Sequence, residues 1–235
     1  MNLRRGTITL VLTMVFIVTS VAGIVGYVWV TGGSGEASVP ISAPLLNHSP
    51  ELNTERLYRI DPSLSKVRFQ VGEVLDSEEQ LVIGETNEVT GDVAINFANP
   101  IASQLGVVRI NVRTLKTDDA KRDRAIRSFI LESGQDRYEF AEFRPLEFIN
   151  MPNSIAFGDT LKFQMQGLLI LREIPVEVLF DAQVTVGARE ISGVAGGAVR
   201  HTDFGLFIPN ARGRVTHVDQ VVWLEIDFIA PVVVS

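Results

Sequence analysis

The feature that most constrains the fold is a period-two alternation of apolar and polar residues, which recurs from Tyr58 onward. In segment 65–71, Val67, Phe69 and Val71 alternate with charged or polar residues. The same alternation is present in segments 91–97, 108–112, 161–166, 176–186 and 224–228. Successive side chains of a strand point to opposite faces, so the pattern predicts half-buried β-strands. Turn signals separate these strands at 99–100, 150–153 and 158–159, which indicates an all-β barrel or sandwich.

Segment Thr117–Leu131 breaks this period and predicts a short amphipathic helix. Thr117 is the expected N-cap, and Asp118 and Asp119 occupy the first turn, where negative charge is favourable. The apolar stripe of this helix consists of Ile126, Phe129 and Ile130. We expect the helix to end near Ser133-Gly134 and to cover one end of a barrel.

An uncharged stretch precedes the domain, and its Ile8–Val30 part is densely apolar. About 20 such residues span a bilayer, whereas the core of a cleavable signal peptide needs only about 7–15. Arg4 and Arg5 lie before the stretch, so we predict a cytoplasmic tail at 1–6 and a single membrane-spanning helix at 7–30. The C-terminal part would then lie on the extracytoplasmic side of the cell membrane.

A long signal peptide, cleaved near Gly35-Glu36-Ala37, is the alternative interpretation of this stretch. Residues 31–54 contain several glycines and prolines without a sustained period, which is typical of a linker. We expect this linker to separate the membrane from a single domain at 55–235.

Charge and residue usage exclude several classes of function. The formal net charge is −7, and Arg4 and Arg5 are the only charged residues before Glu36, so the domain itself is acidic. Nucleic-acid binding needs a basic surface, and this domain does not have that composition. The chain contains no cysteine, which excludes disulfides and thiolate metal sites.

Signals for catalysis are weak. The three histidines, His48, His201 and His217, do not have the spacing of metal ligands. No Gly-x-Ser-x-Gly nucleophile motif occurs, and Gly193–Gly197 lacks the pattern of a dinucleotide site. We therefore expect a protein without catalytic residues, cofactor or metal. An enzyme acting on a lipophilic substrate is the least favoured class.

Five motifs follow one another in register over about Tyr58–Val232. They are Tyr58–Phe69, Gly91–Phe97, Val108–Thr117 with Arg122-Asp123 and Arg127-Ser128, Gln166–Val176, and Arg200–Leu206. Together they resemble the YceI-like, polyisoprenoid-binding, lipocalin-like family. The chain departs from the family pattern at Ala125, Leu169 and Glu173, where His, Thr and Gly are usual.

This resemblance implies an eight-stranded antiparallel barrel whose lumen holds an isoprenoid or a similar amphiphile. The inward-facing residues of the predicted strands would then line the ligand site: Phe69, Ile95, Phe97, Ile110, Phe163, Met165, Phe180, Phe204, Ile226 and Phe228. From the residues alone, a filled barrel with an ordinary core is the favoured interpretation of these side chains, and the resemblance reverses that preference.

Arg200 and Asp203 are candidate polar residues of the site. They could contact a ligand head group at the barrel mouth, or they could form an internal pair that fixes the Asp203-Phe204-Gly205 turn. The function expected from all of these features is a membrane-tethered carrier of a lipophilic molecule. The alternative is a structural or protein-interaction domain with a filled core and no small-molecule ligand.

Overall fold

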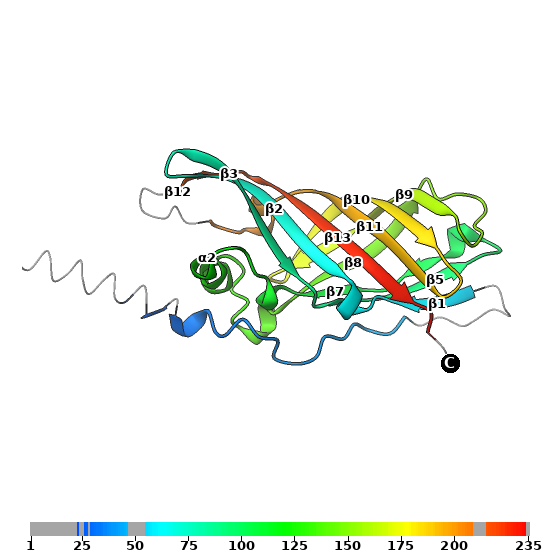
Figure 1. Cartoon of the computed structure of the whole chain (residues 1–235), viewed down its shortest axis with the longest axis horizontal. Coiled ribbons are helices and arrows are strands. Elements are labelled where there is room, and N and C mark those ends of the chain that lie inside the picture. Colours follow the sequence, from blue (N-terminus) through cyan, green and yellow to red (C-terminus); the bar gives the residue numbers. More distant parts are fainter. Residues whose placement is uncertain (1–22, 24–25, 28, 47–54, 209–214, 234–235) are drawn as a thin grey trace, which may run out of the picture.

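The structure is a computed structural model, and it describes residues 23, 26–27, 29–46, 55–208 and 215–233 of the chain. One antiparallel sheet curls into most of the molecule (Figure 1). Along the hydrogen-bonded path, its strands are β12 (Val215–Val218), β2 (Lys66–Leu75), β13 (Val221–Pro231), β11 (Glu190–Arg200), β10 (Ile174–Val186), β9 (Thr160–Leu171), β8 (Phe140–Ile149), β7 (Val108–Asn111) and β4 (Val89–Thr90).

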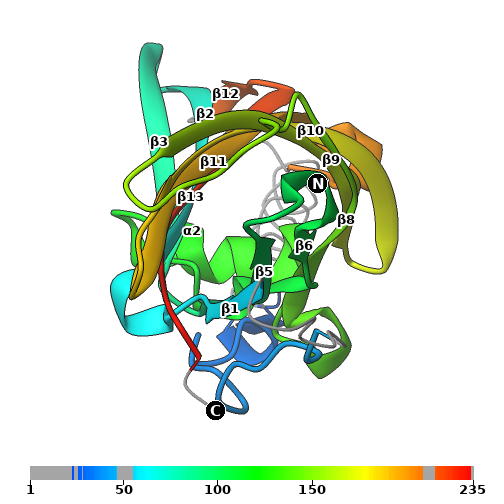
Figure 2. The same cartoon turned by 90° about the vertical axis from the view of Figure 1, so that its right-hand side faces the viewer.

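The sheet nearly closes on itself through the chain segment that contains β3 (Glu78–Thr86) and β4. β3 pairs with β2 at one edge, whereas β4 pairs with β7 at the other edge, and an isolated bridge joins Glu85 to Lys116. Figure 2 looks along the resulting barrel. The all-β antiparallel architecture predicted from the alternation is therefore confirmed.

The expected number of eight strands is too low, because within the described residues nine strands lie along the path and β3 adds a tenth. Two interruptions account for the difference. β12 and β13 both pair with β2, but Asp219 and Gln220 separate them, and the Asp219 amide donates to the Gly72 carbonyl instead. Similarly, Asn87 and Glu88 separate β3 from β4. Such irregularities leave no mark on an alternating sequence pattern.

A small second sheet consists of β1 (Glu55–Arg59), β5 (Asp92–Asn96) and β6 (Gln104–Leu105). It lies at the end of the barrel opposite to the helix α2 (Ala120–Ala125) (Figure 1). Tyr58 of β1 is fully buried and forms a bridge with Val232, which joins the small sheet to the C-terminal strand.

The predicted helix is present but begins later than expected. Asp119, not Thr117, is the N-cap, because its carboxylate accepts from the amides of Lys121 and Arg122. The Thr117 hydroxyl instead donates to Asp123, 2.6 Å away. After Ala125 the helix widens into a π-helical segment, η4 (Ile126–Ile130), and ends at Leu131.

The turn between β9 and β10 contacts the C-terminal end of this helix. Its two residues, Arg172 and Glu173, have φ values of 51° and 65°, a left-handed conformation that suits the twist of a two-residue hairpin. Arg172 pairs with Glu132 at 2.6 Å and donates to the Ile130 carbonyl at 3.3 Å. The β9–β10 turn and the α2–η4 helix therefore belong to the same end of the barrel.

The predicted membrane span, 7–30, falls mostly outside the described residues. Within the described part of the chain, no helix is both long and apolar enough to cross a membrane. Residues 23, 26–27 and 29–31 are helical, and the chain from there to residue 46 runs along the outside of the barrel (Figure 1).

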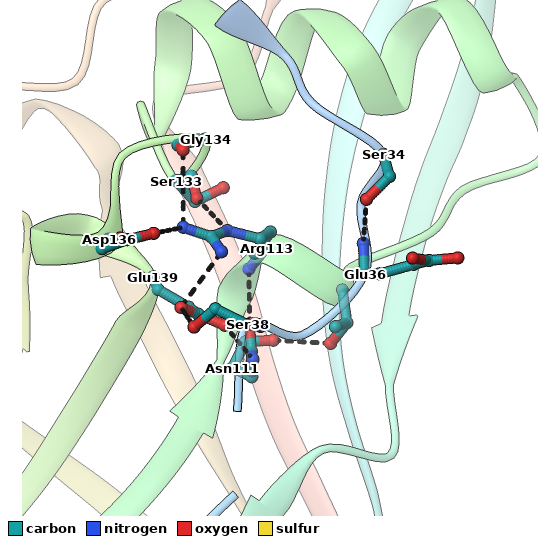
Figure 3. A network of polar contacts seen from close by, with 10 residues as sticks. Ser34, Glu36, Ser38, Asn111, Arg113, Ser133, Gly134, Asp136 and Glu139 are labelled. Atoms are coloured by element: carbon teal, nitrogen blue, oxygen red, sulfur yellow. Dashed lines mark hydrogen bonds and ion pairs between the residues drawn. The ribbon is translucent and has the colours of Figure 1, made fainter. Parts of the chain in front are cut away.

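A buried polar network lies beside the barrel, where this N-terminal stretch meets the domain (Figure 3). Its centre is Glu139, whose side chain is 1% exposed and pairs with Arg113 at 3.1 Å. Asn111 and the Ser38 amide also donate to this carboxylate, each at 2.8 Å, and the Ser38 hydroxyl donates to its other oxygen. Buried charges need such partners, and here both carboxylate oxygens have them.

Candidate binding cavity in the barrel

The barrel is not filled by its own side chains. A cavity of about 340 Å³ runs through it and is lined by residues from every long strand of the sheet. Cavities that hold small molecules usually measure about 300–1,000 Å³. A barrel of this size can either pack its interior or enclose one ligand, and this one retains the space for a ligand.

The alternating pattern explains why the cavity is apolar, since every second side chain of each strand points inward. Nine of the ten predicted lumen residues line the cavity: Phe69, Ile95, Ile110, Phe163, Met165, Phe180, Phe204, Ile226 and Phe228. The structure therefore brings these side chains together around a common space.

Phe97 is the exception. β5 ends at Asn96, so the alternation no longer determines where the next side chain points. The Phe97 ring packs against Phe157, with 4.8 Å between the ring centroids, and it does not line the cavity.

Three phenylalanine rings lie against glycines of neighbouring strands. The rings of Phe69, Phe143 and Phe180 lie where a β-carbon on Gly84, Gly167 and Gly197, respectively, would clash with them. The missing side chains therefore let the rings lie close to the barrel wall, and all three rings line the cavity. This arrangement helps to keep the centre of the lumen open.

Phe143 is a lining residue that the sequence pattern missed. The alternation is obscured in β8 because the register of its pairing with β9 shifts between Pro145 and Glu147. The Phe143 and Phe180 rings pack with their centroids 5.4 Å apart. Gly167 lies in β9, the strand that pairs with β8, and its missing side chain leaves room for the Phe143 ring. This glycine is the one sequence signal that points to Phe143.

The charged groups that reach the cavity are paired with one another. Glu73 is 9% exposed and accepts from Arg122 at 2.9 Å and from Gln80, while Arg122 also pairs with Asp118. Arg68 and Glu225 form a second pair at 2.9 Å. Because each of these charges has an opposite partner, the cavity presents a mainly apolar surface with polar groups already engaged.

Arg200 and Asp203 lie elsewhere. Both side chains are exposed, neither lines the cavity, and no ion pair joins them in the described part of the chain. The turn between them is held by backbone bonds, with the Gly205 amide donating to Thr202 and the Leu206 amide to His201. Gly205 has a φ of 62°, a conformation that favours glycine.

His201 is the polar residue of this motif that lines the cavity. Its Nδ1 lies 3.1 Å from the Leu206 carbonyl, so one ring nitrogen is engaged with the backbone. Among the described residues, no cluster of three or more His, Asp or Glu side chains is arranged to hold a metal ion.

Comparison with known proteins agrees with this geometry. A sequence model of the YceI-like domain matches residues 58–230, whereas no curated protein gives a significant sequence match. A polyisoprenoid binding domain from Saccharophagus degradans, implicated in plant cell wall breakdown, superposes with a TM-score of 0.58 and 15% identity. The match covers 75% of this chain and 98% of that one.

BcnA from Burkholderia cenocepacia has a similar structure, with a TM-score of 0.57 and 14% identity. That match covers 72% of this chain and 98% of BcnA. At these identities the likeness establishes a shared fold, and the coverage indicates that the barrel accounts for nearly the whole of each related structure.

Proposed function

Because the chain belongs to the YceI-like family, we propose that its barrel binds one lipophilic molecule, an isoprenoid-type amphiphile, in the lumen. The observation that supports this proposal most strongly is the apolar cavity of about 340 Å³ inside the barrel. The related Saccharophagus degradans protein is a polyisoprenoid binding domain, which suggests the class of ligand.

The physical basis of binding would be burial of apolar surface. Transfer of such surface out of water contributes about 25 cal/mol per Å², before the costs of association are subtracted. Phe163 and Met165 of β9 and Phe228 of β13 line the cavity and would be among the contacts with the ligand. A bound ligand would also supply van der Waals contacts to lining side chains that otherwise have no partner atoms on the cavity side.

We further propose that the apolar segment 7–30 tethers the barrel to the cell membrane, with the domain on the extracytoplasmic side. The uncharged stretch after Arg4 and Arg5 supports this topology. A tether would hold the carrier beside the bilayer in which its ligand dissolves, and so raise the effective concentration of both.

The alternative, an interaction domain with a filled core, is less well supported because the lumen contains space. In a filled barrel, side chains from the surrounding strands would occupy this space, whereas here the rings of Phe69, Phe143 and Phe180 lie against glycines of the wall.

Mass spectrometry of bound lipophiles tests the ligand proposal. The chain from residue 29 onward would be purified, extracted with organic solvent and compared with two tryptophan variants. Met165→Trp places a ring in the cavity, whereas Lys162→Trp places it on the exposed face of the same strand. We expect a specific lipophile in the wild type and in Lys162→Trp, and little or none in Met165→Trp. Equal recovery from both variants would count against the lumen as the binding site.

A further inference from the structure

The stretch 31–46, here called the strap, is attached to the barrel at several points along its length. Its first contact is Gly32, whose carbonyl accepts from the buried Nε of Arg127 at 2.7 Å. Its last contacts are Ser42, whose carbonyl accepts from Arg109 at 3.1 Å, and Leu46, whose amide donates to Asp92 at 3.2 Å. The strap therefore follows the domain surface from the α2–η4 end toward β5 (Figure 1).

The middle of the strap completes the buried polar network. Ser38 supplies two of the donors to the Glu139 carboxylate, and without them this group would lie buried with fewer partners (Figure 3). The fit is close at the start of the strap as well, since a side chain on Gly134 would clash with the Thr31 carbonyl. These contacts indicate that the strap is part of the folded domain.

The helical residues just before the strap also contact the domain. Tyr27 stacks on Phe129 with 5.6 Å between the centroids, and the Arg124 guanidinium lies 5.1 Å from the Trp29 ring centroid. Phe129 belongs to η4 and Arg124 to α2. The C-terminal end of the apolar segment is therefore fixed against the α2–η4 end of the barrel.

The contacts of the strap with the barrel limit how freely the barrel can move relative to the apolar segment. A free flexible linker of about 23 residues would have a root-mean-square length of roughly 25 Å, and the barrel would turn freely above a membrane. With the strap bound along the domain, little slack remains between the apolar segment and the barrel.

We propose that the strap orients the barrel, so that its α2–η4 end faces the bilayer. The partner of this end is the lipid head-group layer. Three exposed aromatic side chains lie there, Tyr27, Trp29 and the 75% exposed Phe207. Tyr and Trp favour the head-group layer, and Phe can insert at its boundary with the acyl chains. Phe207 belongs to this end because it follows η6 (His201–Phe204), which contacts β10 next to the β9–β10 turn. The inference rests on the proposed tether but not on the proposed ligand.

Two single-cysteine variants test this orientation in the full chain, which has no other cysteine. Thr202→Cys labels η6 at the α2–η4 end, and Ser154→Cys labels the β8–β9 loop at the opposite end; both positions are exposed. The labelled proteins would be reconstituted into phosphatidylcholine–phosphatidylglycerol vesicles that carry head-group-spin-labelled lipid. We expect at least about twofold stronger quenching at Thr202→Cys, since β9 alone separates the two ends by roughly 40 Å.

An insertion of a glycine–serine segment as long as the strap, placed between Val30 and Thr31, should abolish this difference, because it separates the apolar segment from the strap while the strap keeps its own contacts with the barrel. The same segment inserted between Leu3 and Arg4 is the control and should leave the difference unchanged. Equal quenching at both sites in the parent chain, or stronger quenching at Ser154→Cys, would overturn the orientation. A parent chain that fails to float with the vesicles would overturn the tether, whether or not the lumen takes up a lipophile.

Discussion

The lumen of the barrel and the strap network are two interior regions with opposite properties. The lumen is apolar and contains unfilled space, whereas the network around Glu139 is charged and has partners for both carboxylate oxygens. The two regions therefore respond to mutation by different rules. In the lumen a larger side chain has space into which it can extend, while in the network the loss of a single partner leaves a buried charge without that partner.

The largest expected effect comes from breaking the network at its cation. Arg113→Ala leaves Glu139 buried without its counter-charge, and we expect a loss of about 3–5 kcal/mol in the free energy of unfolding. Arg144→Ala, which removes a half-exposed arginine from its pair with Glu142, is the control and should cost about 0–1 kcal/mol. Urea denaturation measures both; similar small losses would show that the network is not a tight structural unit.

A second comparison uses the same new side chain in two environments. Val186 is fully buried and does not line the cavity, so Val186→Trp should overpack the core and cost about 1–3 kcal/mol or more. Met165→Trp instead projects into the cavity, and we expect less than about 1 kcal/mol in the ligand-free protein. Equal, large losses in both variants would mean that the lumen behaves as an ordinary core.

A milder change in the network tests the contribution of the strap alone. Ser38→Ala removes the hydroxyl donor to Glu139 but keeps the backbone amide bond, so we expect a loss of about 1–2 kcal/mol. Ser34→Ala, at an exposed strap position whose hydroxyl only accepts from Glu36, should have little effect. Thermal unfolding of the two variants would distinguish a structural strap from an incidental contact.

The smallest expected effect is on the pH dependence of stability, and it involves Glu142. Burial raises the pKa of Glu142, but hydrogen bonds from Arg109 and Arg144 outweigh burial, and the net result is a pKa below the ordinary value. Glu142 therefore contributes stability that is complete above its unfolded pKa of about 4.3 and is lost as the pH falls through the lower folded value. Glu142→Gln should flatten this part of the stability profile, whereas Met165→Trp should leave its shape unchanged.

The lumen could be predicted from sequence better than the network could. Alternation alone identifies inward positions such as Phe69 and Ile226, because the pattern and the pleat share one period. It fails where a strand ends, as at Phe97, or where pairing shifts, as around Phe143. The helix cap is Asp119 and not Thr117, because the Thr117 hydroxyl is engaged with Asp123 while Asp119 accepts from the first helical amides, a choice that residue types alone do not specify.

The network had no sequence signal of this kind. Arg113 follows β7 in an alternating pattern and resembled an outward charge, but the strand ends at Asn111 and a 3-10 turn carries Arg113 inward. Ser38 lies in a stretch with the composition of a linker. The contact between Ser38 and Glu139 depends on how distant parts of the chain meet, which residue types alone do not specify.

The sequence separation between Ser38 and Glu139 also determines when the buried network can form during synthesis. Ser38 and Glu139 are 101 residues apart, and ribosomes add about 5–20 residues per second. The strap is therefore synthesised roughly 5–20 s before its partner exists. The strap therefore has to wait without its partner, and the network around Glu139 can form only after the chain has been made as far as this residue.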